Sequence, residues 1–94
     1  VFLKNLSRQP HYARSNITFN TIAPGAIMIP NTGWDHERQK KPKTFSQLVK
    51  DQFPLGRLGE PHEVASIVTF ICSPLATLIN GATITCDGGE SRCL

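Results

Sequence analysis

The clearest periodic pattern in the sequence predicts one amphipathic helix. Its apolar positions follow the i, i+3, i+4, i+7 spacing of a buried helix face: Val64, Ile67, Val68 and Ile71. Glu60-Pro61 marks its start, because proline suits the first helical turn and acidic side chains suit the positive end of the helix. Ser73-Pro74 ends it, since proline cannot continue a helix.

Two segments on either side of this helix have the composition of β-strands. Residues 17–23 are rich in β-branched and aromatic side chains and predict a strand that Pro24-Gly25 ends. Residues 82–86 predict a second strand, closed by Asp87-Gly88-Gly89. A strand, a long helical crossover and a second strand form a βαβ outline with parallel strands. Because helices cover both faces of a parallel sheet, we expect this sheet to continue upstream or in a partner chain.

The remaining segments are less regular. Residues 1–9 fit the end of an amphipathic helix, which Pro10 should stop or kink. Residues 26–53 contain prolines and a glycine that break any long element, and we expect one or two short helices there. Trp34 and Phe45 are the largest apolar groups of this segment. They suit a flap over a pocket, and they suit equally a loop packed on a core.

Composition narrows the class of protein. The 94 residues suit one small domain, and 39% hydrophobic residues are ordinary for a folded globular protein. No apolar run approaches the roughly 20 residues that span a bilayer, so we expect no membrane helix. The net charge of +3 comes partly from the run Arg38–Lys43, which lacks the aromatic side chains that stack on bases. We therefore interpret this run as a solvated loop and expect no nucleic-acid partner.

Cysteine and histidine spacing gives no metal motif. The three cysteines contain no CxxC pair, and no histidine stands at zinc-ligand spacing from them: Cys72, Cys86 and Cys93. The three histidines are scattered along the chain: His11, His36 and His62. We expect no metal site, and we expect structural or free thiols in a reducing compartment, the cytoplasm.

Four sequence pieces occur in the order and spacing of one known family. They are Asn20-x-x-x-Pro24-Gly25, Pro54–Pro61 with Glu63-Val64-Ala65, Phe70–Pro74, and Ile79-Asn80-Gly81 with Asp87-Gly88-Gly89. Each piece alone is common, but the four together form a specific signal. From about Ile17 onward the chain resembles the C-terminal part of a short-chain dehydrogenase/reductase.

This resemblance implies a fold and a ligand. The expected fold class is α/β, with residues 1–94 as the C-terminal portion of one NAD(P)-binding domain of the Rossmann type. It would comprise the last two strands of a doubly wound parallel sheet, the crossover helix and a substrate-binding lid over residues 26–53, with Trp34 and Phe45 in the lid. Pro24, Gly25 and Ile27 are implied to bind NAD or NADP. In the family the main chain at the position of Ile27 bonds the nicotinamide carboxamide, and Gly25 allows close approach.

The resemblance also implies an activity, but the chain lacks sequence motifs on which that activity depends. The family transfers hydride between NAD(P) and a small alcohol or carbonyl substrate, commonly as a homo-oligomer. Its glycine-rich phosphate loop and its Tyr-x-x-x-Lys pair are absent, since Tyr12 is followed by Asn16 at the lysine position. Ile29 stands where the family commonly has a threonine. We assign no catalytic residue, and we expect the chain alone to be inactive and to belong to a longer protein, called here the parent protein.

Two alternatives of a different class stay open at this point. The same half-fold could serve as a non-catalytic oligomerisation or interaction module, because the last helix and strand of the family often pack against another subunit. A small nucleic-acid-binding module is disfavoured, since the basic run has no accompanying recognition motif.

Overall fold

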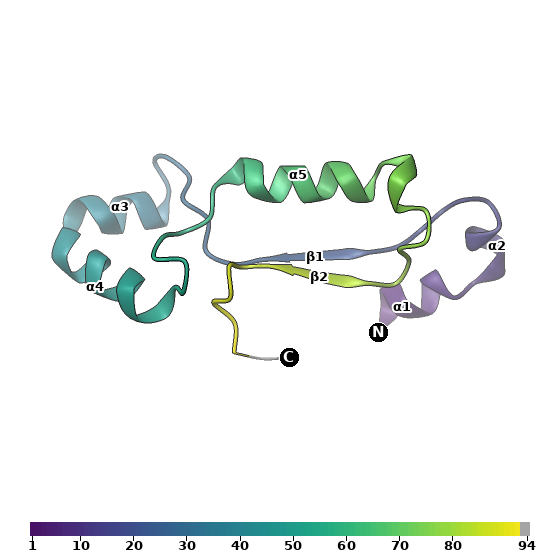
Figure 1. The fold of residues 1–94 in the computed structure, drawn as a ribbon, viewed down its shortest axis with the longest axis horizontal. Coiled ribbons are helices and arrows are strands. Elements are labelled where there is room, and N and C mark those ends of the chain that lie inside the picture. The colour runs from purple at the N-terminus through teal and green to yellow at the C-terminus, as the bar shows by residue number, and fades with distance from the viewer. Residues whose placement is uncertain (93–94) are drawn as a thin grey trace. The chain divides into compact units, whose positions relative to one another are not determined.

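The computed structural model describes residues 1–92 and contains helices, a 3-10 turn and two strands (Figure 1). The elements in chain order are α1 (Phe2–Ser7), α2 (Pro10–Ala13), β1 (Thr21–Pro24), α3 (Gly33–Lys40), α4 (Pro42–Gln52), α5 (Pro61–Ile71), η1 (Pro74–Ala76) and β2 (Thr83–Cys86). The chain divides into two compact units, Val1–Ala23 with Ala65–Thr85, and Pro24–Val64 with the segment from Cys86 onward. Within residues 1–92 no helix is long and apolar enough to cross a membrane.

The two strands form a parallel pair, which confirms the predicted α/β class (Figure 1). The N–H of Thr21 donates to the carbonyl of Ala82 at 2.8 Å, and the N–H of Gly25 donates to the carbonyl of Cys86 at 3.2 Å. Donor and acceptor advance together along both strands, as they do in a parallel ladder. The second strand begins at Thr83, one residue later than its composition predicted.

The first strand is shorter than predicted, because residues 17–20 lie outside β1. The N–H of Phe19 donates to Oδ1 of Asn80 at 3.1 Å, and the N–H of Ala82 donates to Oδ1 of Asn20 at 3.0 Å. Side-chain amides therefore accept the hydrogen bonds that backbone carbonyls accept in a ladder. The prediction of a strand from residue 17 was wrong for this reason, since asparagine side chains compete with backbone pairing.

Pro10 separates two short helices at the start of the first unit. Helix α1 ends at Ser7, and α2 begins at Pro10 with Gln9 as its N-cap residue. Proline is tolerated there because the first N–H groups of a helix have no intrahelical partner. The expected stop is thus confirmed, and the same proline starts the next helix.

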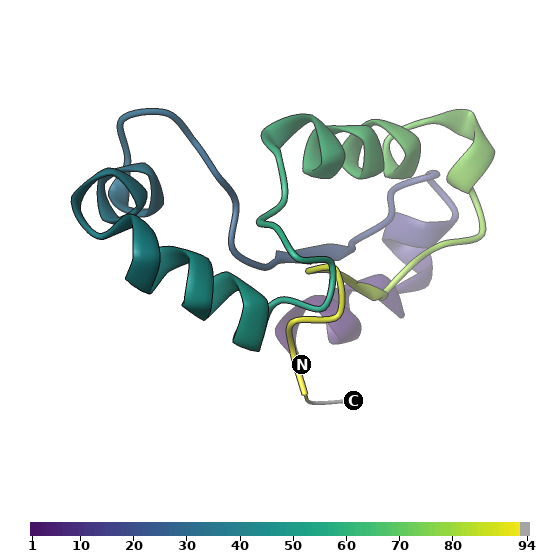
Figure 2. The same cartoon turned by 60° about the vertical axis from the view of Figure 1, so that its left-hand side comes forward.

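Helix α5 has the predicted limits, but its apolar face is not buried. Val64, Ile67 and Ile71 are half-buried, and Val68 is 42% exposed. Figures 1 and 2 show the part of α5 in the first unit running along one face of the strand pair. Two strands offer too narrow a surface to cover a whole helix face, and this is why the predicted burial was wrong.

The start of α5 lies in the second unit and is fixed by one carboxylate. Oε1 of Glu63 accepts from the N–H of Glu60 at 2.9 Å, an arrangement that satisfies one free donor of the helix start. The Arg57 guanidinium donates to both oxygens of Glu63, at 2.8 and 3.1 Å. These bonds from Arg57, with the Glu60 N–H, lower the pKa of Glu63 from 4.5 to about 2.

The second unit has a small hydrophobic core of its own. Val49, Phe53 and Leu58 are buried in it, and four half-buried apolar residues pack against them: Ala26, Met28, Trp34 and Phe45. Helices α3 and α4 follow one another closely and contact each other (Figure 2). Residues 26–53 therefore contain two short helices, as predicted, which fold over shared apolar side chains.

The Arg57–Glu63 pair predicts how stability depends on pH. Because the pKa of Glu63 is lower in the folded protein than its ordinary value of 4.5, the pair stabilises the fold fully above about pH 5 and loses this effect as pH falls towards 2. We expect Glu63→Gln in the parent protein to lower Tm near neutral pH, with a difference that shrinks in this acidic window. Thermal melts across the pH range measure it.

The control is Glu37→Gln, which changes an exposed carboxylate of α3 that has no ion pair within residues 1–92. Its Tm difference should stay small at every pH. Both side chains of the Arg57–Glu63 pair are well exposed, so added salt should reduce the effect of Glu63→Gln. A Tm difference for Glu63→Gln that is the same at pH 7 and near pH 2 would contradict the assignment.

Candidate functional site

The candidate site is the main chain after β1, from Pro24 to Met28. The N–H of Ala26 donates to Oε1 of Glu90 at 3.0 Å, and the carbonyl of Ala26 accepts from the N–H of Gly59 at 3.0 Å. The N–H of Met28 donates to the carbonyl of Gly59 at 2.9 Å. These bonds make Ile27 and Gly59 an isolated parallel bridge within the second unit.

Ile27 has the one N–H group of this segment without a partner, since the N–H groups of Gly25, Ala26 and Met28 are all bonded within residues 1–92. Within residues 1–92, neither its N–H nor its carbonyl has a hydrogen-bond partner, although the residue is half-buried. The carbonyl of Ala26 and the N–H of Ile27 share one trans peptide plane, as do the carbonyl of Ile27 and the N–H of Met28. Gly59 binds one group of each plane, so both groups of Ile27 point away from Gly59.

One donor and one acceptor side by side fit a primary carboxamide, which carries one acceptor oxygen and two donor hydrogens. The nicotinamide of NAD or NADP ends in such a group. Ile27 thus meets the chemical requirement for the contact that the resemblance implies. The atoms that fit are main-chain atoms, so the side chain of Ile27 is not part of the match.

Gly25 is packed against a loop of its own unit. A Cβ atom built on Gly25 would lie 2.6 Å from Cβ of Asp87 and 2.7 Å from Oε1 of Glu90. It would also lie 3.0 Å from Cα of Asp87, a backbone atom that cannot rotate away. Glycine is therefore required here for the approach of the loop after β2, whichever ligand the site binds.

That loop is folded by the side chain of Asp87. Its two oxygens accept from the N–H groups of Gly89 and Ser91, both at 2.9 Å, and the N–H of Glu90 donates to the carbonyl of Asp87 at 3.1 Å. Gly88 and Gly89 have φ angles of +62° and +88°, which other residues rarely adopt. The Asp87-Gly88-Gly89 sequence thus forms a tight turn that presents Glu90 to Ala26.

Glu90 is the functional candidate that the sequence did not reveal. The sequence marked only the turn before it, and no spacing rule connects a residue after that turn with Ala26, 64 positions earlier. The Asp-Gly-Gly turn was the available signal, because such a turn reverses the chain and directs the next side chain back toward the strand end.

The predicted lid residues belong to the core of the second unit. The ring of Trp34 packs edge-on against Phe45 and Phe53, with centroids 6.4 and 6.1 Å apart. Asp35, buried in α3, accepts from the N–H of Asn31 at 2.9 Å and pairs with Arg38. The Asn31 bond, followed by Arg38, lowers the pKa of the Asp35 carboxyl.

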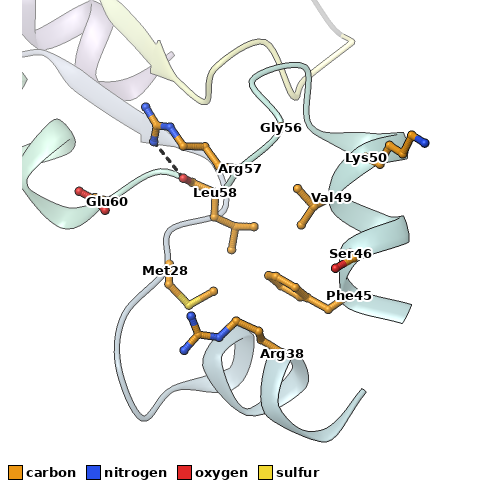
Figure 3. A pocket seen from close by; sticks show the side chains of 10 residues that line it. All are labelled: Met28, Arg38, Phe45, Ser46, Val49, Lys50, Gly56, Arg57, Leu58 and Glu60. Carbon is orange, nitrogen blue, oxygen red and sulfur yellow. Dashed lines mark hydrogen bonds between the residues drawn. The ribbon is translucent and has the colours of Figure 1, made fainter. Parts of the chain in front are cut away.

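A pocket of about 500 Å³ opens beside this core (Figure 3). Apolar side chains of four residues line it, from α4, the segment after β1 and the connector before α5: Met28, Phe45, Val49 and Leu58. The guanidinium of Arg57 turns toward the carbonyl of Leu58, and the Lys50 ammonium points away from the centre of the pocket (Figure 3). Apolar side chains thus form much of the lining, and charged groups lie at the rim. Three further polar residues line the pocket as well: Arg38, Ser46 and Glu60. Phe45 lines it, whereas Trp34 supports Phe45 from the core.

Tyr12 and two of the three cysteines also lie within the described residues. Tyr12 packs edge-on against Phe19, with centroids 5.3 Å apart. Cys72 is exposed and Cys86 is half-buried, while Cys93 lies outside the described residues. Among residues 1–92, no three His, Cys, Asp or Glu side chains lie together as metal ligands would.

Three features define part of an α/β protein of the Rossmann type. They are a parallel strand pair, a crossover helix and, after the first strand, a main-chain donor and acceptor without partners within residues 1–92. A family model described as enoyl-(acyl carrier protein) reductase matches residues 3–91. The chain belongs to the short-chain dehydrogenase/reductase family.

Individual relatives agree with this assignment. A tropinone reductase homologue of Arabidopsis thaliana is 41% identical over 80 residues, which cover 85% of this chain and 28% of that protein. The 3-oxoacyl-[acyl-carrier-protein] reductase FabG of Aquifex aeolicus is 41% identical over 88 residues, covering 94% of this chain and 32% of that protein. The chain therefore spans about a third of the length of these relatives.

Solved structures give the same fold. An NADPH-dependent reductase involved in bacilysin biosynthesis, YwfH, has a TM-score of 0.79 at 31% identity, covering 99% of this chain and 36% of that chain. A 3-oxoacyl (acyl-carrier-protein) reductase from Agrobacterium tumefaciens, solved with NADP bound, has a TM-score of 0.81 at 26% identity. That match covers 94% of this chain and 33% of that one.

The packing of Gly25 predicts a loss of stability on substitution. Gly25→Ala in the parent protein would place Cβ against Asp87, and we expect the free energy of unfolding to fall by about 1–3 kcal/mol. Gly33→Ala is the matched control, because nothing lies within 4 Å of its added Cβ, and it should change stability by less than about 0.5 kcal/mol. Denaturant unfolding measures both. Equal stabilities for the two variants would contradict the packing role.

Proposed function

We propose that this chain forms the C-terminal part of an NAD(P)-dependent oxidoreductase that transfers hydride between nicotinamide and a small alcohol or carbonyl substrate. The observation that carries the proposal is the available N–H and carbonyl pair of Ile27, three residues after the end of β1. Membership of the short-chain dehydrogenase/reductase family supports it. The proposal places the protein in the cytoplasm.

In this proposal the chain binds and orients the cofactor and contributes no reacting group. The cofactor, when bound, supplies or accepts the hydride. The main chain of Ile27 holds the carboxamide from one edge, and Pro24 and Gly25 form the strand end that leads into this contact. A ring held at its carboxamide presents one face to the substrate, and such orientation accounts for much of the rate in this type of reaction. The proton donor belongs to the part of the parent protein outside this chain.

Residues 26–53 are proposed to act as the substrate lid. The arrangement that supports this is the apolar pocket beside α4, with Phe45 in its wall and Trp34 behind Phe45 (Figure 3). An apolar wall stabilises the hydrocarbon part of a substrate and excludes water from the reacting carbonyl. The rim charges leave the pocket open to substrates with polar ends.

The second candidate function is an interaction module, and exposed apolar side chains favour it. In the first unit Phe70, Leu75 and Leu78 are 44%, 82% and 96% exposed. Exposed apolar groups of this size often contact a partner, and a second copy of the parent protein is the occupant we propose. This contact is compatible with the enzyme, whereas a pure interaction module has no reason to bind a dinucleotide. Cofactor binding therefore separates the two candidates.

The proposed cofactor contact can be tested without changing the protein. The 3-acetylpyridine analogue of the cofactor keeps the carbonyl oxygen but lacks the amide N–H₂, so it cannot donate to the carbonyl of Ile27. We expect the parent protein to bind NADH or NADPH, and to bind the matching analogue about tenfold more weakly, which is about 1.4 kcal/mol. Isothermal titration gives both Kd values.

Carbonyl-dependent oxidation of NADH or NADPH, followed by absorbance, completes this test. Ile27→Val is the control variant, because it leaves both main-chain groups in place and should preserve both Kd values. The absence of NADH and NADPH binding by the folded parent protein would overturn the proposed function. Equal binding of cofactor and analogue would remove the carbonyl of Ile27 from the contact while leaving the enzyme class in place.

The lid is tested on α4. Phe45→Ala removes an aromatic wall of the pocket, and we expect KM for a carbonyl substrate to rise about tenfold, with the Kd of the cofactor unchanged. Leu48→Ala is the matched control, since Leu48 lies on the same helix, is 37% exposed and does not line the pocket. Steady-state kinetics with either variant measures the effect. If both variants have the same KM, residues 26–53 do not cover the substrate through Phe45.

A further inference from the structure

Glu90 has an unusual place for a surface carboxylate. It is half-buried, and its Oε1 accepts from the main-chain N–H of Ala26 at 3.0 Å, across 64 positions of sequence. The same oxygen lies 2.7 Å from the position of a Cβ atom built on Gly25. The carboxylate therefore lies directly against the backbone of two residues that precede Ile27.

The loop holds Glu90 in this place before any ligand binds. Asp87 accepts from the N–H groups on both sides of Glu90, those of Gly89 and Ser91, and the N–H of Glu90 itself closes a turn onto the Asp87 carbonyl. A side chain that starts from a fixed backbone loses less entropy when it makes its own hydrogen bond. A charged acceptor also makes a stronger hydrogen bond than a neutral one.

The consequence is that both peptide planes around Ala26 are held. Glu90 holds the plane before it through the Ala26 N–H, and Gly59 holds the plane after it through the Ala26 carbonyl. Peptide planes are rigid, so fixing the two planes fixes φ and ψ of Ala26. The second of these planes carries the N–H of Ile27. Glu90 thus helps to set the direction of the donor that the proposed function assigns to nicotinamide.

We propose that Glu90 is a positioning residue for the nicotinamide end of the dinucleotide. It does not touch the cofactor, but it aligns the Gly25–Ile27 main chain that does. This inference rests on the proposed function. It adds to the contact already described by assigning part of its alignment to a side chain from the segment after β2.

The test compares two ligands and three variants of the parent protein. The ligands are NADH or NADPH and the matching ADP-ribose, which lacks nicotinamide. Glu90→Ala removes the acceptor, and we expect about tenfold weaker binding of the reduced cofactor, which is about 1.4 kcal/mol, with unchanged binding of ADP-ribose. Glu90→Gln keeps an acceptor oxygen at the same reach and should restore most of the affinity.

Glu90→Asp keeps the charge but shortens the side chain by one methylene, and it should resemble Glu90→Ala. It serves as the second variant if Glu90→Ala does not fold. Glu37→Ala, which removes an exposed carboxylate from α3, is the control and should bind both ligands as the unchanged protein does. Isothermal titration gives each Kd on folded material.

Three outcomes would overturn the proposal. Equal weakening of the reduced cofactor and ADP-ribose would mean that Glu90 only supports the fold. Unchanged binding in Glu90→Ala and Glu90→Asp would mean that Gly59 alone aligns Ile27, and the proposed function would stand. If the unchanged parent protein binds ADP-ribose but gains nothing from nicotinamide, the contact at Ile27 falls together with the role of Glu90.

Discussion

The pairing of Gly59 with the segment after β1 is the constraint on which the candidate site depends. Gly59 donates to the carbonyl of Ala26 and accepts from the N–H of Met28, so a single residue fixes the peptide planes on both sides of Ile27. A Cβ atom on Gly59 would lie 2.9 Å from Cδ1 of Ile27, the end of a flexible side chain, and 3.7 Å from the carbonyl oxygen of Ala26. The N–H and the carbonyl of Ile27 point away from Gly59, because the other polar group of each peptide plane is bonded to Gly59.

The residues around this pairing pack in the small core of the second unit. Leu58, next to Gly59, is buried in that core, and Ala26 and Met28 pack against it on either side of Ile27. The lid helices contribute Val49 and Phe53 to the same core. The lid helices and the segment after β1 therefore pack on one small core.

Polar side chains decide where several elements stop. Asn20 and Asn80 accept hydrogen bonds that a longer ladder would have given to backbone carbonyls, and the strand pair is short as a result. Glu63 satisfies the N–H of Glu60 at the start of α5, and Asp87 folds the turn after β2. Each of these contacts replaces a backbone partner with a side chain, and each lies in one of the sequence pieces that mark the family.

The sequence by itself determined α5 with its limits, the parallel strand pair and the family, because periodicity, proline positions and turn residues act locally. It also marked Pro24-Gly25 and Ile27 through the resemblance. Tertiary structure decided the rest. Gly25 faces Asp87, Glu90 reaches Ala26, and Val68 on α5 stays exposed. Each of these facts depends on which distant segment lies opposite, and no local pattern encodes a partner more than sixty residues away.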